Sequence, residues 1–219
     1  KVAVYDDQEQ ILLETVRHAR SELDAAGSIG NQRGLRSQYV LQALEAHKIP
    51  LSSLNAVAGR GGLVQPTDSG TDPINDQMME DLLSATAEVH ASALGGVIAR
   101  QIGDSAGIPS YVVDPIVVDE MEQVAKLTGF PGIERRSIFH ALNQKAVARR
   151  CAADMGMQHE DGRFVVAHMG GGITGGAHRS GPVIDVNDAL AGGAPYSTEP
   201  CGPVPGLGTI GRVPPAAHP

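Results

Sequence analysis

The residues of this chain that are best suited to bind an anion surround a run of three glycines. Gly170, Gly171 and Gly172 follow an apolar segment that ends at His168. Because glycine has no Cβ, successive N–H groups of such a turn can approach phosphate oxygens closely. The run lacks the Gly-Lys-Ser/Thr of a P-loop and the helix that follows a dinucleotide fingerprint. It is either a phosphate-binding turn or an ordinary glycine-rich hairpin.

Two charged residues each follow a predicted strand. Arg60 lies in the glycine-rich turn 59–62, where its guanidinium could donate two parallel hydrogen bonds to a carboxylate or phosphate. A loop-capping arginine is the alternative. Asp114 follows the apolar segment 110–113, at the strand end where α/β sheets place ligands. For Asp114 the alternative is a helix N-cap.

Polar residues interrupt the apolar pattern of two predicted helices. His140 and Asn143 are three residues apart, so they share a helix face that could border a cleft. His90 has a similar setting, and a hydrogen-bonded core histidine is the alternative for both. No HExxH or GxSxG motif occurs, and Cys151 and Cys201 have no CxxC partner. Neither a structural zinc site nor a serine-hydrolase nucleophile is therefore predicted.

The elements that must hold these residues alternate between strands and helices, which predicts an α/β architecture. Apolar runs predict strands at residues 2–5, 54–58, 110–113, 164–167, 177–178 and 182–186. Helices are expected at residues 35–47, about 76–105, 119–127 and 137–155. The acidic residues of the third helix, Asp119, Glu120 and Glu122, are expected to be solvated or to lie near the helix N-terminus.

The composition excludes several classes of protein. The net charge is −8, and 3 Phe, 4 Tyr and no Trp leave few rings for stacking bases, so nucleic-acid partners are not expected. No segment reaches the roughly 18 consecutive apolar residues of a membrane helix. Two cysteines exclude a disulfide scaffold, and a reducing cytoplasm is the expected location.

Taken together, the motifs resemble the acetate/butyrate kinase family, with butyrate kinases as the most similar pattern. The resemblance extends to about Ser197 and rests on residues 59–62, 90–92, 112–121, 136–149, 168–172, 176–179 and 183–190. It implies an actin-like, sugar-kinase-like fold built from duplicated ribonuclease-H-like α/β domains. We expect an N-terminal domain over 1–133 and a truncated second domain over 134–219, with an unstructured tail from about 203.

The chain also departs from the family pattern. The family's N-terminal phosphate hairpin, which would precede Lys1, is missing, and so is the C-terminal part of the second domain. Pro200 stands where the family has an arginine. These departures predict a fragment.

The resemblance implies a phosphotransferase that converts butanoate and ATP to butanoyl phosphate and ADP with Mg²⁺. It implies catalytic roles for Asp114, Arg60 and His140, nucleotide or phosphate binding by His168, Gly170, Gly171 and Gly172, substrate binding by His90 and Asn143, and metal binding by Asp114. The expected partners are ATP and a small carboxylic acid, and the full-length form is expected to be a homo-oligomer.

Two alternatives remain. One is a kinase of the same type that prefers a propionate-type or branched-chain acid. The other is a non-catalytic remnant that binds nucleotide weakly or only pairs with another subunit.

Overall fold

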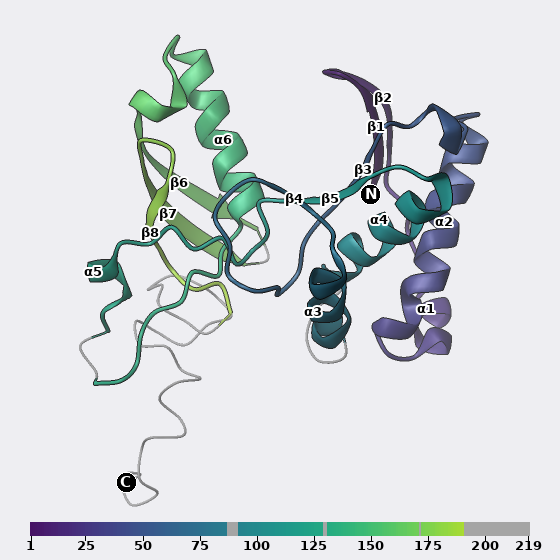
Figure 1. The fold of residues 1–219 in the computed structure, drawn as a ribbon, viewed down its shortest axis with the longest axis horizontal. Helices are drawn as coiled ribbons and strands as arrows, with labels where there is room; N and C mark the ends of the chain where they lie inside the picture. Colours follow the sequence, from purple (N-terminus) through teal and green to yellow (C-terminus); the bar gives the residue numbers. More distant parts are fainter. Residues whose placement is uncertain (87–91, 129–130, 171, 191–219) are drawn as a thin grey trace, which may run out of the picture. The chain divides into compact units, whose positions relative to one another are not determined.

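The computed structural model describes residues 1–86, 92–128, 131–170 and 172–190 (Figure 1). Its contacts divide the chain into two compact units. Unit 1 comprises Lys1–Val64 and Thr71–Val113, and unit 2 comprises Gln65–Gly70 and Asp114–Pro219. The domain boundary expected after residue 133 stays a prediction.

Unit 1 is built around a three-stranded mixed sheet. Its strand order is β3 (Val57–Gly59), β5 (Ser110–Val113) and β4 (Thr71–Pro73). Strand β5 pairs in parallel with β3 and antiparallel with β4. A separate antiparallel hairpin is formed by β1 (Val2–Asp6) and β2 (Glu9–Glu14).

Four helices complete unit 1. They are α1 (Arg20–Ala26), α2 (Arg33–Ala46), α3 (Asp76–Thr86) and α4 (Ala93–Ala106), with 3-10 turns at Gly30–Gln32 and Leu51–Ser53. Helix α4 lies very close to β3. A Cβ built on Gly59 would lie only 2.2 Å from the carbonyl oxygen of Gly95, so there is no room for a side chain there. Glycine at both positions permits this backbone approach.

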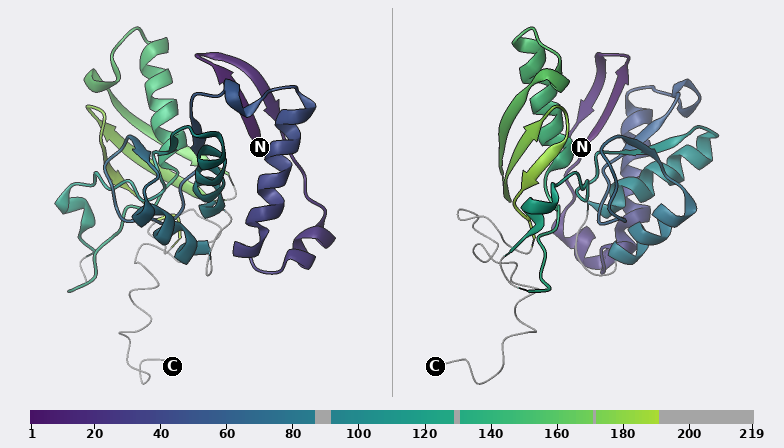
Figure 2. Two further views of the ribbon diagram at one scale, coloured as in Figure 1. Left: turned by 45° about the vertical axis from the view of Figure 1, so that its right-hand side comes forward. Right: turned by 60° about the vertical axis from the view of Figure 1, so that its left-hand side comes forward.

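The described part of unit 2 contains an antiparallel sheet and a helix that covers one of its faces (Figure 2). The strands are β6 (Arg163–Met169), β7 (Ile173–Arg179) and β8 (Val183–Val186), in that order, and the helix is α6 (Ala141–Asp154). The described part of the unit also contains a short helix α5 (Gln123–Lys126) and a 3-10 turn at His159–Asp161. Its core contains Val118, Met121, Phe139, Ala141, Val183 and Val186.

The two faces of this sheet differ because side chains alternate along a strand. Val165 and Met169 of β6 point away from the core and are 86% and 81% exposed. Thr174 and His178 of β7 point the other way and are buried. Polar side chains of β7 therefore face helix α6.

Several predicted elements are confirmed, and others are shorter than predicted. Strand 110–113 is β5, and the glycine at position 107 ends α4 with a φ of +69°. The helix predicted over 76–105 is two helices, α3 and α4, and residues 87–91 between them lie outside the described part. The helix predicted over 119–127 shrinks to the four residues of α5.

Helix α6 begins later than predicted. It starts at Ala141 rather than Ser137, whose hydroxyl donates to the carbonyl of Val118 instead of capping the helix. Strand β2, helix α1 and strand β4 were not expected from the sequence. The tail predicted from about residue 203 lies outside the described residues. Within the described ranges, no helix combines the length and apolar character that a membrane crossing requires.

Candidate active site

Two histidines stack face to face where α6 begins and β6 ends. The rings of His140 and His168 are 3.7 Å apart between centroids and only 7° from parallel. Nδ1 of His168 lies 2.9 Å from Oδ1 of Asn143, and Nδ1 of His140 lies 2.9 Å from Oγ1 of Thr174.

The glycine turn between β6 and β7 lies against these rings. The N–H of Gly170 donates to the carbonyl of Gly172 over 3.1 Å. A Cβ on Gly170 would lie 2.9 Å from Nε2 of His168, and one on Gly172 would lie 3.3 Å from Cε1 of His140. Gly171 lies outside the described residues. Gly170 and Gly172 thus lie against the two rings, and the Gly170 N–H is already bonded within the turn.

Behind the histidine pair, a chain of buried polar groups crosses from α6 to β7. Nε2 of Gln144 donates to both the carbonyl oxygen and the hydroxyl of Thr174, over 3.1 and 3.0 Å. Oε1 of Gln144 lies 3.3 Å from Nε2 of His178. All three residues are buried, so the hydrogen bonds between them are shielded from water.

Asp114 occupies a conformation that few non-glycine residues adopt. Its φ is +39° and it is buried, directly after β5. Its N–H donates to the carbonyl of Gly70, and its Oδ1 accepts the Gly70 N–H, each over 2.9 Å. Its Oδ2 lies 3.4 Å from the guanidinium of Arg149. Aspartate tolerates the left-handed region better than most residues, and these bonds hold it there.

Glu120 and Lys145 form a buried ion pair at 2.8 Å. The Glu120 carboxylate also accepts hydrogen bonds from the Ser69 hydroxyl and the Val183 N–H. Burial raises the pKa of Glu120, but the hydrogen bonds from Lys145, Ser69 and the Val183 N–H outweigh it and lower the pKa overall.

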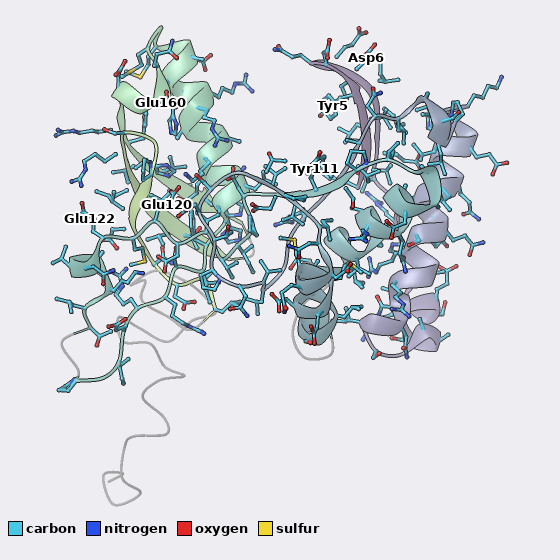
Figure 3. All side chains as sticks on the ribbon, viewed as in Figure 1. Tyr5, Asp6, Tyr111, Glu120, Glu122 and Glu160 are labelled. Atoms are coloured by element: carbon cyan, nitrogen blue, oxygen red, sulfur yellow. The ribbon has the colours of Figure 1, made fainter. Side chains whose placement is uncertain are left out.

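The sequence-based expectation for the acidic residues near α5 was wrong for Glu120. This residue, labelled in Figure 3, is inside unit 2 rather than solvated, because Lys145 neutralises it there. Asp119 pairs with Lys126 at 2.7 Å, and the more exposed Glu122 pairs with Arg179. All three acids precede α5 instead of lying within a helix.

Two further histidines of unit 2, His178 and His159, have lowered pKa values, which favour their neutral forms. Burial, with a smaller effect from the Lys145 charge, lowers the pKa of His178 to about 4. Burial and the Arg149 charge also lower the pKa of His159. Among the described residues, Nδ1 of His178 and Nε2 of His159 have no hydrogen-bond partner.

The remaining predicted site residues are not part of this cluster as described. Arg60 is an exposed residue that follows β3 in unit 1. His90 lies outside the described residues. Unit 2 therefore brings together His140, His168, Asn143, Gly170 and Gly172, and it holds Asp114 through Gly70 and Arg149.

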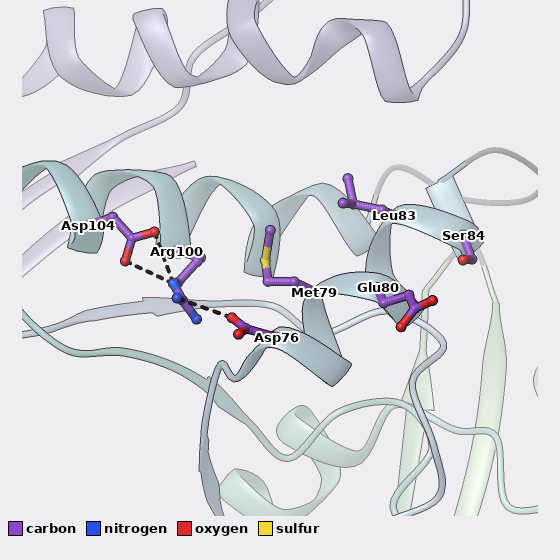
Figure 4. Close-up of a pocket in the computed structure, with 7 residues that line it drawn as sticks. All are labelled: Asp76, Met79, Glu80, Leu83, Ser84, Arg100 and Asp104. Carbon is purple, nitrogen blue, oxygen red and sulfur yellow. Dashed lines mark hydrogen bonds and ion pairs between the residues drawn. The ribbon is translucent and has the colours of Figure 1, made fainter.

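Unit 1 has a surface pocket of about 590 Å³ between α3 and α4 (Figure 4). It is lined by Asp76, Met79, Glu80, Leu83, Ser84, Arg100 and Asp104. None of the predicted site residues belongs to this lining. Arg100 is already bound by Asp76, Asp104 and the carbonyl of Ile74, so its charge is compensated.

Sequence reasoning did not single out five polar residues that contact the candidate site or its buried neighbours: Gln144, Lys145, Arg149, Thr174 and His178. For two of them a signal was present. Helix α6 buries residues 141, 144, 145, 148 and 152, the spacing of one helix face. Gln144 and Lys145 are the polar members of a face otherwise made of alanines, which indicates buried polar partners.

The described residues contain no group of three or more His, Cys, Asp or Glu side chains that could hold a metal ion. Asp114 is the predicted ligand, but its Oδ1 and Oδ2 already contact Gly70 and Arg149. As described, these residues do not fit a metal held by protein side chains alone.

No family model matches the chain. Solved structures with a similar fold include an acetate kinase from Porphyromonas gingivalis, with a TM-score of 0.58 and 19% identity over 73% of this chain and 45% of that chain. An acetate kinase from Entamoeba histolytica has a TM-score of 0.55 and 15% identity over 72% and 42%. A propionate kinase from Francisella tularensis subsp. tularensis has a TM-score of 0.53 and 21% identity over 71% and 44%.

The chain spans less than half the length of each of these three structures. At these identities the likeness establishes the fold, and it confirms the predicted actin-like α/β class. The protein thus has the fold of acetate and propionate kinases over the part that they match.

Proposed function

We propose that the chain is part of a carboxylate kinase of the butyrate kinase type, which converts butanoate and ATP to butanoyl phosphate and ADP. The observation that carries the proposal is the stacked pair His140 and His168 beside the Gly170–Gly172 turn. The fold shared with acetate and propionate kinases supports it.

The proposed chemistry suits these residue types. A carboxylate oxygen is already nucleophilic, so it can form a bond to the γ-phosphorus while the bond from that phosphorus to ADP breaks. No strong general base is needed. Catalysis depends on positioning and on stabilising the spread negative charge of the phosphoryl group. In the proposal, ring N–H groups of His140 and His168 donate to phosphate oxygens, and the Gly170 N–H joins them by releasing the carbonyl of Gly172.

Mg²⁺ would neutralise part of the phosphate charge when it arrives with the nucleotide, since protein sites commonly share Mg²⁺ with substrate phosphates. The role of Asp114 as a metal ligand stays a prediction, because it would require Arg149 to release Oδ2. Arg60 is proposed to face the acyl carboxylate or the phosphoryl group, and His90 and Asn143 are proposed to bind the substrate.

The identity of the acid is a finer proposal. One methylene in an apolar pocket changes binding by only about 1–3 kcal/mol, so butanoate, propionate and branched acids differ modestly in affinity. The similarity to a propionate kinase supports the propionate-type alternative. A non-catalytic remnant that binds nucleotide weakly is the alternative of a different class.

The test is hydroxamate trapping of acyl phosphate formed by the purified chain from ATP, Mg²⁺ and butanoate, propionate, isobutyrate or acetate. We expect butanoyl phosphate to form fastest and Asp114→Asn to lower the rate by about 10²-fold. The matched control is Asp154→Asn, an exposed residue of α6, which should leave the rate unchanged.

A folded chain that forms no acyl phosphate from any acid would contradict the catalytic proposal. If that chain still binds ATP weakly in calorimetry, the remnant alternative is supported instead. A faster reaction with propionate or isobutyrate than with butanoate would replace the proposed acid and retain the reaction class.

A further inference from the structure

The buried hydrogen bonds of Gln144 and Thr174 end at Nδ1 of His140. Which group donates and which accepts in each of them follows from the chemistry of the partners. The carbonyl oxygen of Thr174 lies 3.1 Å from one end of the Gln144 amide. A backbone carbonyl only accepts, so this end of the amide is the NH₂ group. The other end, Oε1, therefore faces Nε2 of His178 and accepts a hydrogen bond from its N–H.

The same NH₂ group determines what the Thr174 hydroxyl does. Nε2 of Gln144 also lies 3.0 Å from Oγ1 of Thr174 and donates to it. Within the described residues the only other group bonded to this hydroxyl is Nδ1 of His140, at 2.9 Å. A hydroxyl proton that finds an acceptor within this network points at Nδ1, and Nδ1 is then the unprotonated nitrogen of the ring.

We propose that Gln144 and Thr174 are positioning residues that hold His140 as a neutral imidazole with its proton on Nε2. Protonation of Nδ1 would leave the Thr174 hydroxyl proton without an acceptor in this arrangement, so the chain of bonds opposes it. The nitrogen that keeps the proton lies on the side of Gly172, where a Cβ would be 3.6 Å from Nε2.

Close packing keeps the amide of Gln144 in place. Gln144 is completely buried, and a Cβ on Gly176 of β7 would lie 2.1 Å from its Oε1. Only a glycine allows the amide to occupy this space, and a fully satisfied buried network is rigid. Packing thereby fixes the position of the amide, and the Thr174 carbonyl fixes which end of it donates.

The consequence for catalysis rests on the proposed function. A His140 ring fixed in the Nε2–H form presents a hydrogen-bond donor, and not a lone pair, to the phosphate-binding turn. Such a donor needs no reorganisation when charge develops on a phosphoryl oxygen. Thr174 and Gln144 would act on the reaction through His140 and contact no substrate themselves.

The experiment is long-range ¹H–¹⁵N NMR of the 219-residue chain labelled with [¹⁵N]histidine, with His140 assigned by the His140→Asn variant. In the wild type we expect unprotonated Nδ1 and protonated Nε2 for both His140 and His178. Thr174→Val should move the ¹⁵N chemical shift of His140 Nδ1 away from its hydrogen-bonded value. It should also change the ratio of the two His140 tautomers about fivefold. The His178 signals should stay where they are.

Two further variants control for the loss of a hydroxyl. Thr174→Ser keeps the hydroxyl and should keep the wild-type signals. Thr128→Val removes a hydroxyl that bonds to the carbonyl of Ile133 elsewhere in unit 2, and His140 should not respond. In a chain that forms acyl phosphate, Thr174→Val should lower kcat about tenfold with little change in KM.

A wild-type His140 with its proton on Nδ1 would overturn the proposal, even if the Thr174→Val variant does not fold. So would identical His140 signals in wild type and folded Thr174→Val. Absence of acyl phosphate formation bears on the proposed function alone, because the NMR signals report the tautomer in either case.

Discussion

At the scale of single residues, unit 2 gives the buried carboxylates of Glu120 and Asp114 charged partners, and burial lowers the pKa of its buried histidines, His159 and His178. Glu120 has Lys145, and Asp114 has Arg149 and the Gly70 N–H. His178 has no carboxylate close enough to favour its charged form over burial, so its pKa falls to about 4. The cost of protonating these groups should therefore be visible in the stability of the protein.

Acid should destabilise the protein through His178. Its pKa is lowered from 6.5 to about 4, so the unfolded chain binds the proton first as the pH falls. Stability is then lost progressively between pH 6.5 and about pH 4, by about 3 kcal/mol in the free energy of unfolding. His159 adds in the same direction, and the lowered pKa of Glu120 adds a further loss below pH 4.5.

The measurement is urea unfolding from pH 4 to pH 7 of wild type, His178→Gln and His47→Gln. His178→Gln should show a shallower loss of stability between pH 6.5 and 4. His47, a half-exposed residue beside Glu14, is the control, and its replacement should keep the wild-type slope. Equal slopes in all three proteins would exclude a buried, neutral His178.

Removing one partner of the Glu120–Lys145 pair should be strongly destabilising. Lys145→Met would leave a buried carboxylate without its counter-ion, which costs about 3–5 kcal/mol in the free energy of unfolding. The control on the same helix is Arg150→Ala, which removes an exposed pair with Asp154 and should cost less than about 0.5 kcal/mol. A similar midpoint of urea unfolding for both variants would contradict the buried pair.

At the scale of elements, close backbone contacts determine how helices meet strands. In unit 1 a Cβ on Gly95 of α4 would lie 2.6 Å from the carbonyl oxygen of Arg60, directly after β3. In unit 2 the backbone of Gly176 in β7 instead lies against a side chain, the amide of Gln144 in α6. Glycines in these positions therefore serve packing, whereas a glycine in an open helix position only weakens the helix.

Two helical glycines should respond to alanine in opposite directions. Gly95→Ala should destabilise unit 1 by about 1–3 kcal/mol, because backbone and not a flexible side chain obstructs the new Cβ. Gly34→Ala, in α2, has no atom within 4 Å of the new Cβ and should stabilise the helix by up to about 1 kcal/mol. Thermal unfolding of the two variants and wild type gives the comparison, and a stabilised Gly95→Ala would show that α4 does not approach β3 so closely.

At the scale of the whole molecule, contacts are concentrated within two units. Such units commonly open as cooperative parts, each with its own free energy. The sheet β3–β5–β4 and helix α4 organise one unit, while the sheet β6–β7–β8 and helix α6 organise the other. Strand β5 belongs to the first unit, and the next residue, Asp114, belongs to the second.

Destabilising changes should therefore act on one unit at a time. In hydrogen exchange followed by mass spectrometry, Gly95→Ala should raise exchange in peptides from residues 1–64 and 71–113. Lys145→Met should raise it in peptides from 65–70 and 114–190. Faster exchange throughout the chain in both variants would show a single cooperative unit.

Local sequence patterns determined much of the secondary structure. Strand β5, helix α2, the late part of α6 and the glycine turn at 170–172 follow from apolar periodicity, glycine placement and helix stops, which act over a few residues. The same patterns placed Asn143 correctly on α6. They put His140 inside that helix, where it is instead the N-cap, and they ended the strand before His168, which belongs to β6. Their grouping into one site came from family resemblance, not from periodicity.

Only the tertiary structure decided which polar residues are partners. Glu120 meets Lys145 across 25 positions, and Thr174 meets His140 across 34 positions. Side-chain period distinguishes the two faces of a helix or strand, but it does not say which faces pack together or which charge will be neutralised when buried. For that reason Glu120 looked solvated in the sequence, and the bonds from Gln144 and Thr174 to His140 appear only when α6 lies on β7.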